Sequence, residues 1–153
     1  MRTIRYWRND ISVEEFIKRE IVKNAGPDSV VFKDQLIGLC KELEISFETK
    51  MSKEDLFNAL LDAGHTYQML AEHFKIGVSS QVYQQSFGIT HSDVKSLENK
   101  KVLKVVGYYD FRAFGRYNSA PLYDVYQYAN MSDDDMKQLL QEYCTNKRKG
   151  HKR

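Results

Sequence analysis

Residues 80–106 read SQVYQQSFGITHSDVKSLENKKVLKVV and form the most informative part of the chain. A short helix predicted over Ser80–Ser86 ends near Gly88, because glycine tolerates the left-handed backbone of a tight turn. A second helix is predicted to start at Thr90, whose hydroxyl can cap free backbone N–H groups. Asp93, three residues further on, suits the positive end of that helix. The stretch therefore predicts two short helices joined by a turn.

The second helix has an apolar side and a polar side. Val94 and Leu97 are three residues apart and face the same side, where they can pack with Tyr83, Phe87 and Ile89. The outer side is expected to carry six polar residues: Thr90, His91, Ser92, Lys95, Ser96 and Asn99.

This arrangement resembles the helix-turn-helix family, with Gly88 as the turn glycine and the five apolar residues at the family's apolar positions. Lys100 and Lys101 lead into an apolar run, 102–106, which is followed by a loop and a second strand-like run, 122–128. Two helices followed by a β-hairpin resemble a winged helix-turn-helix. The resemblance implies an outer helix in the DNA major groove and a hairpin tip at phosphates or the minor groove. The alternative is an ordinary helical hairpin that packs on a core.

Residues 107–121, GYYDFRAFGRYNSAP, are predicted to form the loop of this wing. Five aromatic residues in it are interleaved with Arg112 and Arg116, and arginine favours phosphates and narrow minor grooves. Alternatively, part of the aromatic set caps the core beneath the hairpin.

The N-terminal residues offer two interpretations. Residues 2–8, RTIRYWR, form either an edge strand with Ile4 and Tyr6 inward, which we favour, or a basic arm that reaches DNA. A helix capped by Ser12 is predicted to run to about Asn24.

Residues 33–61 predict two amphipathic helices separated by an extended polar piece, 46–52. Lys50, Lys53 and Leu56 fit the start of the second helix in SAP and Rho-N-terminal segments, which this region resembles. The resemblance implies nucleic-acid contacts by Thr49, Lys50 and Lys53. Two helices that simply pack together are the equal alternative.

Further helices are predicted after both regions. A helix over Tyr67–Lys75 is predicted to support the helical bundle. Alternatively, it pairs with residues 78–87 in a second helix-turn-helix frame, whose spacing is one residue out of register with the usual pattern of that family. Ser132 is predicted to cap a C-terminal helix that packs on the core or on a second protomer. The basic end, 147–153, is predicted to be a disordered tail.

Composition limits the function classes. The 153 residues carry a net charge of +2, but residues 88–119 hold six Lys and Arg against three Asp and Glu. No apolar run is long enough to span a bilayer. The two cysteines, Cys40 and Cys144, are too few for a disulfide framework, so we expect a cytoplasmic protein in which both thiols are buried. The four histidines lack metal-ligand spacing and no catalytic motif is present, so we expect neither cofactor, metal site nor enzyme activity.

The predicted fold is mainly α with a β-hairpin, divided into a SAP-like region (1–64), a winged helix-turn-helix domain with a C-terminal helix (65–146) and the tail. The predicted function is sequence-specific binding of double-stranded DNA by a transcriptional regulator or accessory factor, with a homodimer as a possible form. The general make-up weakly resembles small regulators of bacterial mobile elements such as conjugative plasmids and phages. The alternative is an interaction module that inhibits a host enzyme without DNA. The expected DNA contacts are Thr90, His91, Ser92, Lys95, Asn99, Lys100, Lys101, Lys104, Arg112, Arg116, Lys50 and Lys53.

Overall fold

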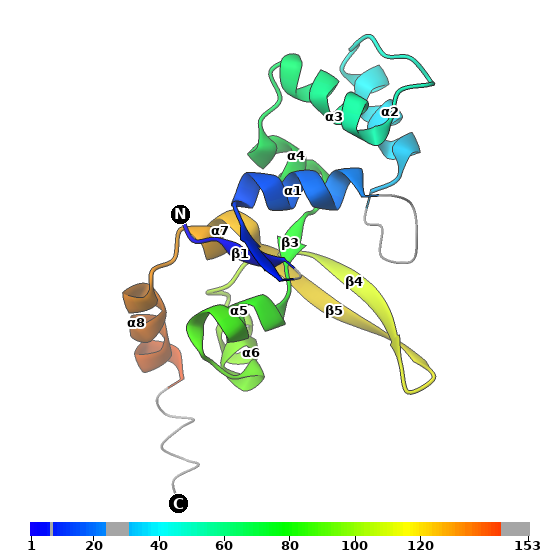
Figure 1. The fold of residues 1–153 in the computed structure, drawn as a ribbon. Helices are drawn as coiled ribbons and strands as arrows, with labels where there is room; N and C mark the ends of the chain where they lie inside the picture. The colour runs from blue at the N-terminus through cyan, green and yellow to red at the C-terminus, as the bar shows by residue number, and fades with distance from the viewer. Residues whose placement is uncertain (7, 24–30, 145–153) are drawn as a thin grey trace, which may run out of the picture. The chain divides into compact units, whose positions relative to one another are not determined.

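A computed structural model describes residues 1–6, 8–23 and 31–144. The described residues form a mixed α/β structure with eight helices and two small antiparallel sheets (Figure 1). In chain order the elements are β1 (Ile4–Tyr6), β2 (Asn9–Ile11), α1 (Val13–Val22), α2 (Lys33–Glu42), α3 (Lys53–Asp62), α4 (Tyr67–Phe74), β3 (Gly77–Val78), α5 (Ser80–Phe87), α6 (His91–Asn99), β4 (Val105–Ala113), β5 (Arg116–Asp124), α7 (Val125–Ala129) and α8 (Asp133–Tyr143).

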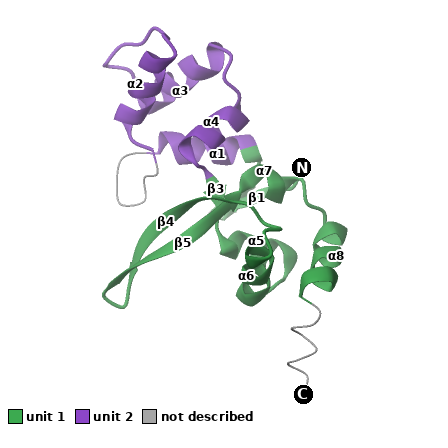
Figure 2. Ribbon diagram, turned by 180° about the vertical axis from the view of Figure 1, so that it is seen from behind, with its two compact units in different colours: residues 1–13, 77–153 green, residues 14–76 purple. Residues whose placement is uncertain are grey.

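The chain divides into two compact units (Figure 2). The first unit combines residues 1–13 with the chain from residue 77 onward, and the second unit comprises residues 14–76. The boundaries differ from those expected at residue 64, because α4 belongs to the second unit and the N-terminal strands belong to the first. The predicted tail, 147–153, lies outside the described residues.

The second unit contains the two predicted amphipathic helices. α2 packs against α3, and the apolar side chains of both helices are buried at helical spacing. Ser52 and Asp55 form a capping box at the start of α3, which confirms the predicted cap. Cys40 is a buried free thiol of α2, and burial raises the pKa of this thiol.

The first unit contains both sheets. β1 pairs with β2, with Ile4 opposite Ile11, so the edge-strand interpretation of the N-terminus is confirmed. The second sheet has the order β3-β5-β4, in which β3 precedes the α5–α6 pair and joins the return strand of the hairpin. β3 thus separates α4 from α5, and the second helix-turn-helix frame is wrong.

The hairpin differs from its prediction in two ways. Residues 107–121 are not a loop, because β4 and β5 stay paired from Gly107–Leu122 out to Ala113–Arg116 and leave only Phe114 and Gly115 at the tip. The return strand does not reach Tyr128 either. The Asp124 carboxylate accepts hydrogen bonds from the backbone N–H groups of residues 126 and 127 and starts α7.

An aromatic cluster forms the core beneath α5. Tyr83 is fully buried, and its ring meets Tyr123 of β5 and Tyr128 of α7 edge-to-face, with centroids 5.7 and 5.2 Å apart. Phe87 stacks on Tyr83 with a centroid distance of 5.9 Å. These contacts fix α5 against the hairpin strand and α7.

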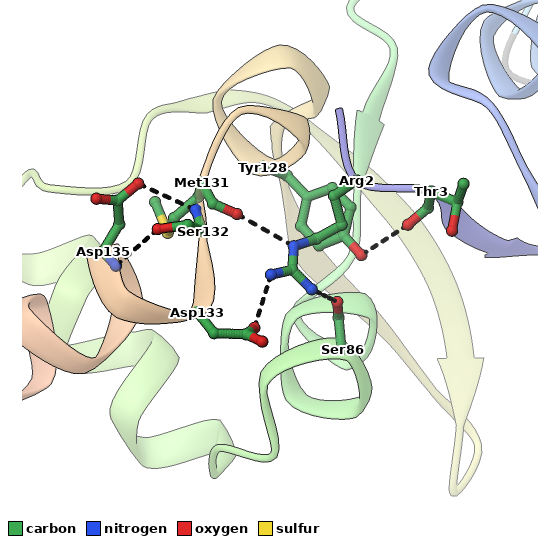
Figure 3. Close-up of polar contacts among 8 residues, drawn as sticks. All are labelled: Arg2, Thr3, Ser86, Tyr128, Met131, Ser132, Asp133 and Asp135. Carbon is green, nitrogen blue, oxygen red and sulfur yellow. Dashed lines mark hydrogen bonds and ion pairs between the residues drawn. The ribbon is translucent and has the colours of Figure 1, made fainter.

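Arg2 ties the start of the chain to the end of α5 and the start of α8 (Figure 3). Its guanidinium donates to the Met131 carbonyl (3.1 Å), the Ser86 hydroxyl (3.0 Å) and the Asp133 carboxylate (2.7 Å). The same group lies 4.1 Å from the centroid of the Phe87 ring. Arg2 therefore has a structural role, in contrast to the DNA-reaching arm considered as an alternative.

Candidate nucleic-acid interface

The turn between α5 and α6 has the geometry expected from the sequence. Gly88 has φ 66°, and its N–H donates to the Gln84 carbonyl at 2.9 Å. The capping box at the start of α6 is also present. The Asp93 N–H donates to Thr90 Oγ1 at 3.1 Å, and the Thr90 N–H donates to Asp93 Oδ2 at 3.2 Å. Both features confirm two helices joined at Gly88.

The polar side of α6 faces solvent over most of its length. Val94 and Leu97 are fully buried, as predicted. Thr90, His91, Ser92 and Asn99 are exposed, and so are Lys100, Lys101 and Lys104 beyond the helix. Seven of the eight predicted contacts in this stretch therefore lie together on or beside one helix surface.

Lys95, the eighth, is half-buried and paired. Its Nζ lies 3.4 Å from Glu98 Oε1, and 42% of the side chain remains exposed. The same carboxylate oxygen accepts a 2.5 Å hydrogen bond from the Tyr123 hydroxyl. Burial, followed by this hydrogen bond, raises the pKa of Tyr123. Glu98 thus links α6 to β5 and offsets part of the Lys95 charge.

Glu98 is a positioning residue that the sequence does not reveal. Its partner Tyr123 lies 25 positions along the chain, and no local pattern signals that contact. Gln127 was missed for the same reason. Its side-chain amide accepts from the Lys104 N–H at 2.9 Å and donates to the Val102 carbonyl at 2.7 Å. These bonds fix the segment that carries the lysines between α6 and β4.

His91 and Gln84 meet at the beginning of α5. His91 Nδ1 and Ser80 Oγ lie 3.1 Å apart, and Gln84 Nε2 donates to the same hydroxyl at 2.9 Å. His91 remains exposed, so its ring is oriented by Ser80 and still accessible to a ligand. This polar cluster links the start of α6 to the first turn of α5.

The hairpin carries the second set of predicted contacts. Arg112 and Arg116 are exposed, and within the described part of the chain neither guanidinium forms a salt bridge. Arg112 lies over the Tyr117 ring, 5.4 Å from its centroid. All five aromatic residues of the hairpin are exposed: Tyr108, Tyr109, Phe111, Phe114 and Tyr117. None of the five belongs to the buried core, which Tyr83, Tyr123 and Tyr128 form at this sheet. Tyr109 and Phe111, 37% and 41% exposed, are more covered than the other three.

The hairpin and α8 flank the helix pair on opposite sides (Figures 1 and 2). α8 packs against α6, and the Cys144 thiol at its end lies 4.0 Å from the Asp93 carbonyl. Cys144 is buried, as predicted. α8 therefore packs on its own chain, one of the two positions expected for it, and leaves the polar side of α6 open.

The two lysines predicted in the second unit differ from each other. Lys50 is exposed in the segment before α3. The Lys53 ammonium donates to the carbonyl of Lys23 at 2.7 Å and to that of Val31. Burial, with a smaller effect of the Lys23 charge, lowers the pKa of Lys53. These bonds occupy the ammonium group within the unit, so we leave Lys53 out of the proposed surface.

No group of His, Cys, Asp or Glu side chains that could hold a metal ion occurs in residues 1–6, 8–23 and 31–144. None of the helices over the same residues combines the length and the apolar character needed to cross a bilayer. Comparison of the chain with protein-family models, with curated proteins and with solved structures finds no match.

Proposed function

We propose that the protein is a sequence-specific, double-stranded DNA-binding protein of winged helix-turn-helix architecture, acting as a transcriptional regulator or an accessory factor. α6 enters the major groove, and the tip of the β4–β5 hairpin contacts phosphates or the adjacent minor groove. The observation that carries the proposal is the pairing of an open polar helix side with a hairpin that carries two arginines without acidic partners among the described residues.

The element order supports this proposal. A short strand, two helices joined by a turn, and a hairpin whose return strand pairs with the first strand make up the sheet order β3-β5-β4. This order keeps the second helix at the surface while the first is covered by the aromatic cluster. α6 thus presents side chains that can read base edges, with each good bidentate contact worth about 1–3 kcal/mol.

Charge supports it as well. Lys100, Lys101 and Lys104 follow α6 directly, and all three are exposed without a salt bridge in the described structure. Together with Arg112 and Arg116 they supply five cations for phosphate contacts. Each neutralised phosphate steepens the dependence of log affinity on log salt by about 0.9 for duplex DNA.

The test combines a footprint with a titration. Nuclease footprinting of the full chain on fragments from its own genetic neighbourhood would locate a site, and fluorescence anisotropy at about 50 and 200 mM salt would measure affinity for it. Replacement of Lys95 and Arg112 by alanine should abolish binding at the higher salt. Lys137→Ala on α8 removes one exposed cation from another element and should leave affinity within about twofold.

Unchanged affinity in the Lys95 and Arg112 double variant would contradict the proposed surface. A footprint with two related half-sites would support the homodimer, and a single protected stretch bound by one copy would argue against it. Size measurement of the free protein and of the complex gives the stoichiometry directly.

A second candidate is a protein-interaction module that inhibits a host enzyme. The exposed aromatic residues of the hairpin favour it, since Tyr108 and Tyr117 are 66% and 81% exposed and such side chains often anchor protein interfaces. This candidate predicts no salt-sensitive binding to duplex DNA, so the same titration separates the two.

A further inference from the structure

The tip of the β4–β5 hairpin carries an aromatic side chain in an unfavourable backbone conformation. Phe114 has φ 54° and Gly115 has φ 75°, and the strands pair directly on either side as Ala113–Arg116. Positive φ at both central residues is typical of a type I′ turn, for which Asn-Gly is the favoured sequence. A bulky residue is strained at this position, and Phe114 is nevertheless fully exposed there.

The two arginines beside the tip lie on opposite faces of the hairpin. In an antiparallel pair, directly opposed residues share a face and successive residues alternate. Arg112 opposes Tyr117, whereas Arg116 opposes Ala113, so one guanidinium projects from each face. Phe114 extends beyond both. The nearest acidic residue along the hairpin is Asp110, which opposes Ser119 further down the strands.

We propose that this tip enters the DNA minor groove and that Phe114 inserts between two neighbouring base pairs as a wedge. The inference rests on the DNA-binding function proposed above and names the mode of contact. The two phosphate backbones that border the minor groove lie on either side of an inserted hairpin, where Arg112 and Arg116 each meet one. Apolar wedges of this kind unstack a base step and kink the duplex.

The charges favour duplex DNA over a protein partner as the ligand of the tip. Residues 111–118 carry two positive charges and no negative charge, and their cations face both ways from a single apolar point. A protein pocket would have to surround Phe114 with acidic groups on both sides. Duplex DNA presents that pattern at every minor-groove step, with a stacked apolar interior between two lines of phosphates.

Unwinding of a closed circular plasmid tests the wedge without knowledge of a specific site. The full-length protein is titrated onto a plasmid that topoisomerase I then relaxes, and the linking number is read after protein removal. The wild-type protein should lower the linking number in proportion to the bound protein. Phe114→Asn places a residue favoured at this turn position, so it preserves the hairpin while it removes the ring.

Phe114→Asn should bind duplex DNA about tenfold more weakly and cause no unwinding at saturation. The matched control is Tyr108→Thr, which removes an exposed aromatic ring from the strand away from the tip and should keep both unwinding and an affinity within about threefold of wild type.

The outcomes separate the two proposals. Salt-sensitive duplex binding with no change in linking number, or equal unwinding by Phe114→Asn and wild type, overturns the wedge and leaves the DNA-binding function in place. A stronger, Phe114-dependent affinity for single-stranded DNA also overturns the wedge, because it assigns the ring to stacking on unpaired bases. Absence of duplex binding by the wild-type protein at about 50 mM salt overturns the proposed function together with the wedge.

Discussion

The two helix pairs of this protein, α2–α3 and α5–α6, begin their second helices with the same kind of cap, but the lysines next to the caps have different roles. Each second helix begins with a capping box, Ser52 with Asp55 and Thr90 with Asp93. In the first pair, Lys53 turns inward and binds two backbone carbonyl groups. The comparison teaches that a lysine near a helix start does not by itself mark a ligand surface, because its long-range partners decide where it points.

The two helix pairs also differ in where the residues that pack against them lie in the sequence. α2 and α3 pack through aliphatic side chains and Phe57 within one continuous stretch of sequence. α5 depends on aromatic rings that arrive from β5 and α7, 40 and more residues later. We therefore expect substitutions in the aromatic cluster to disturb the helix pair of the candidate interface far more than the other pair.

The largest expected effect is that of Tyr83→Ala. Removal of this fully buried ring should lower the free energy of unfolding of the first unit by about 3–5 kcal/mol. Denaturant unfolding combined with hydrogen exchange would measure it, and protection should be lost over residues 80–99 while residues 33–62 keep theirs. Equal loss in both helix pairs would contradict the difference in their support.

Tyr83→Phe is the matched variant. The Tyr83 hydroxyl is buried and has no hydrogen-bond partner among the described residues. Burial raises the pKa of this hydroxyl, and the nearby Asp124 and Tyr128 raise it further to a smaller extent. Removal of this oxygen should leave stability unchanged or increase it by about 1 kcal/mol. A loss as large as that of Tyr83→Ala would contradict this assignment.

Lys53→Met tests the inward lysine. Loss of its two hydrogen bonds should destabilise the second unit by about 1–2 kcal/mol without any change in DNA affinity. The pKa of Lys53 in the folded protein lies below the ordinary value of 10.5. At pH values between these two pKa values folding releases protons, so the contribution of Lys53 to the free energy of unfolding increases as the pH rises. The stability difference between wild type and variant should therefore grow at alkaline pH.

A nucleic-acid role for Lys53 predicts the reverse pattern. Lys53→Met would then weaken binding, and the stability difference would not depend on pH. Lys50→Met provides the exposed counterpart, for which we expect no measurable loss of stability.

The two caps provide a direct comparison of the pairs. Ser52→Ala and Thr90→Ala should each cost about 1 kcal/mol of unfolding free energy, because each removes one capping hydrogen bond of the same geometry. Only Thr90→Ala should also weaken DNA binding. Thermal unfolding and the anisotropy titration together give both quantities, and a DNA effect of Ser52→Ala would extend the interface to the second unit.

The smallest expected effect is a gain of affinity in Glu98→Gln. The amide still accepts the Tyr123 hydrogen bond, while Lys95 is released from its ion pair and one negative charge is removed from the helix. Affinity for duplex DNA should rise about two- to fivefold at low salt. Glu42→Gln at the end of α2 removes an exposed negative charge from the other pair and should leave affinity unchanged.

Local chemistry predicted much of the architecture. The Gly88 turn and the caps at Ser52, Thr90 and Ser132 involve residues within a few positions of one another, and all four occur where the sequence indicates. Contacts between distant residues were not predictable in this way. Glu98 meets Tyr123, and Lys53 meets carbonyl groups 22 and 30 positions before it, which no periodicity reveals.

The end of the hairpin shows a different limit. The alternation in Leu122–Tyr128 fits a strand, but buried Val125, Tyr128 and Ala129 also fit helical spacing. The Asp124 cap decides between the two. The length of β4 and β5 was hidden as well, since Gly115 and the polar residues around it are typical of a longer loop.

The position of Arg2 has a consequence for folding during synthesis. Residues 14–76 form a continuous unit that can close as soon as they leave the ribosome, whereas the first strand belongs to a unit completed from residue 77 onward. Arg2 finds Met131 and Asp133 only when the chain has grown by about 130 residues. The N-terminal segment therefore stays without its partners while the intervening unit folds. In nascent chains halted before residue 131, we expect proteases to cleave this segment readily.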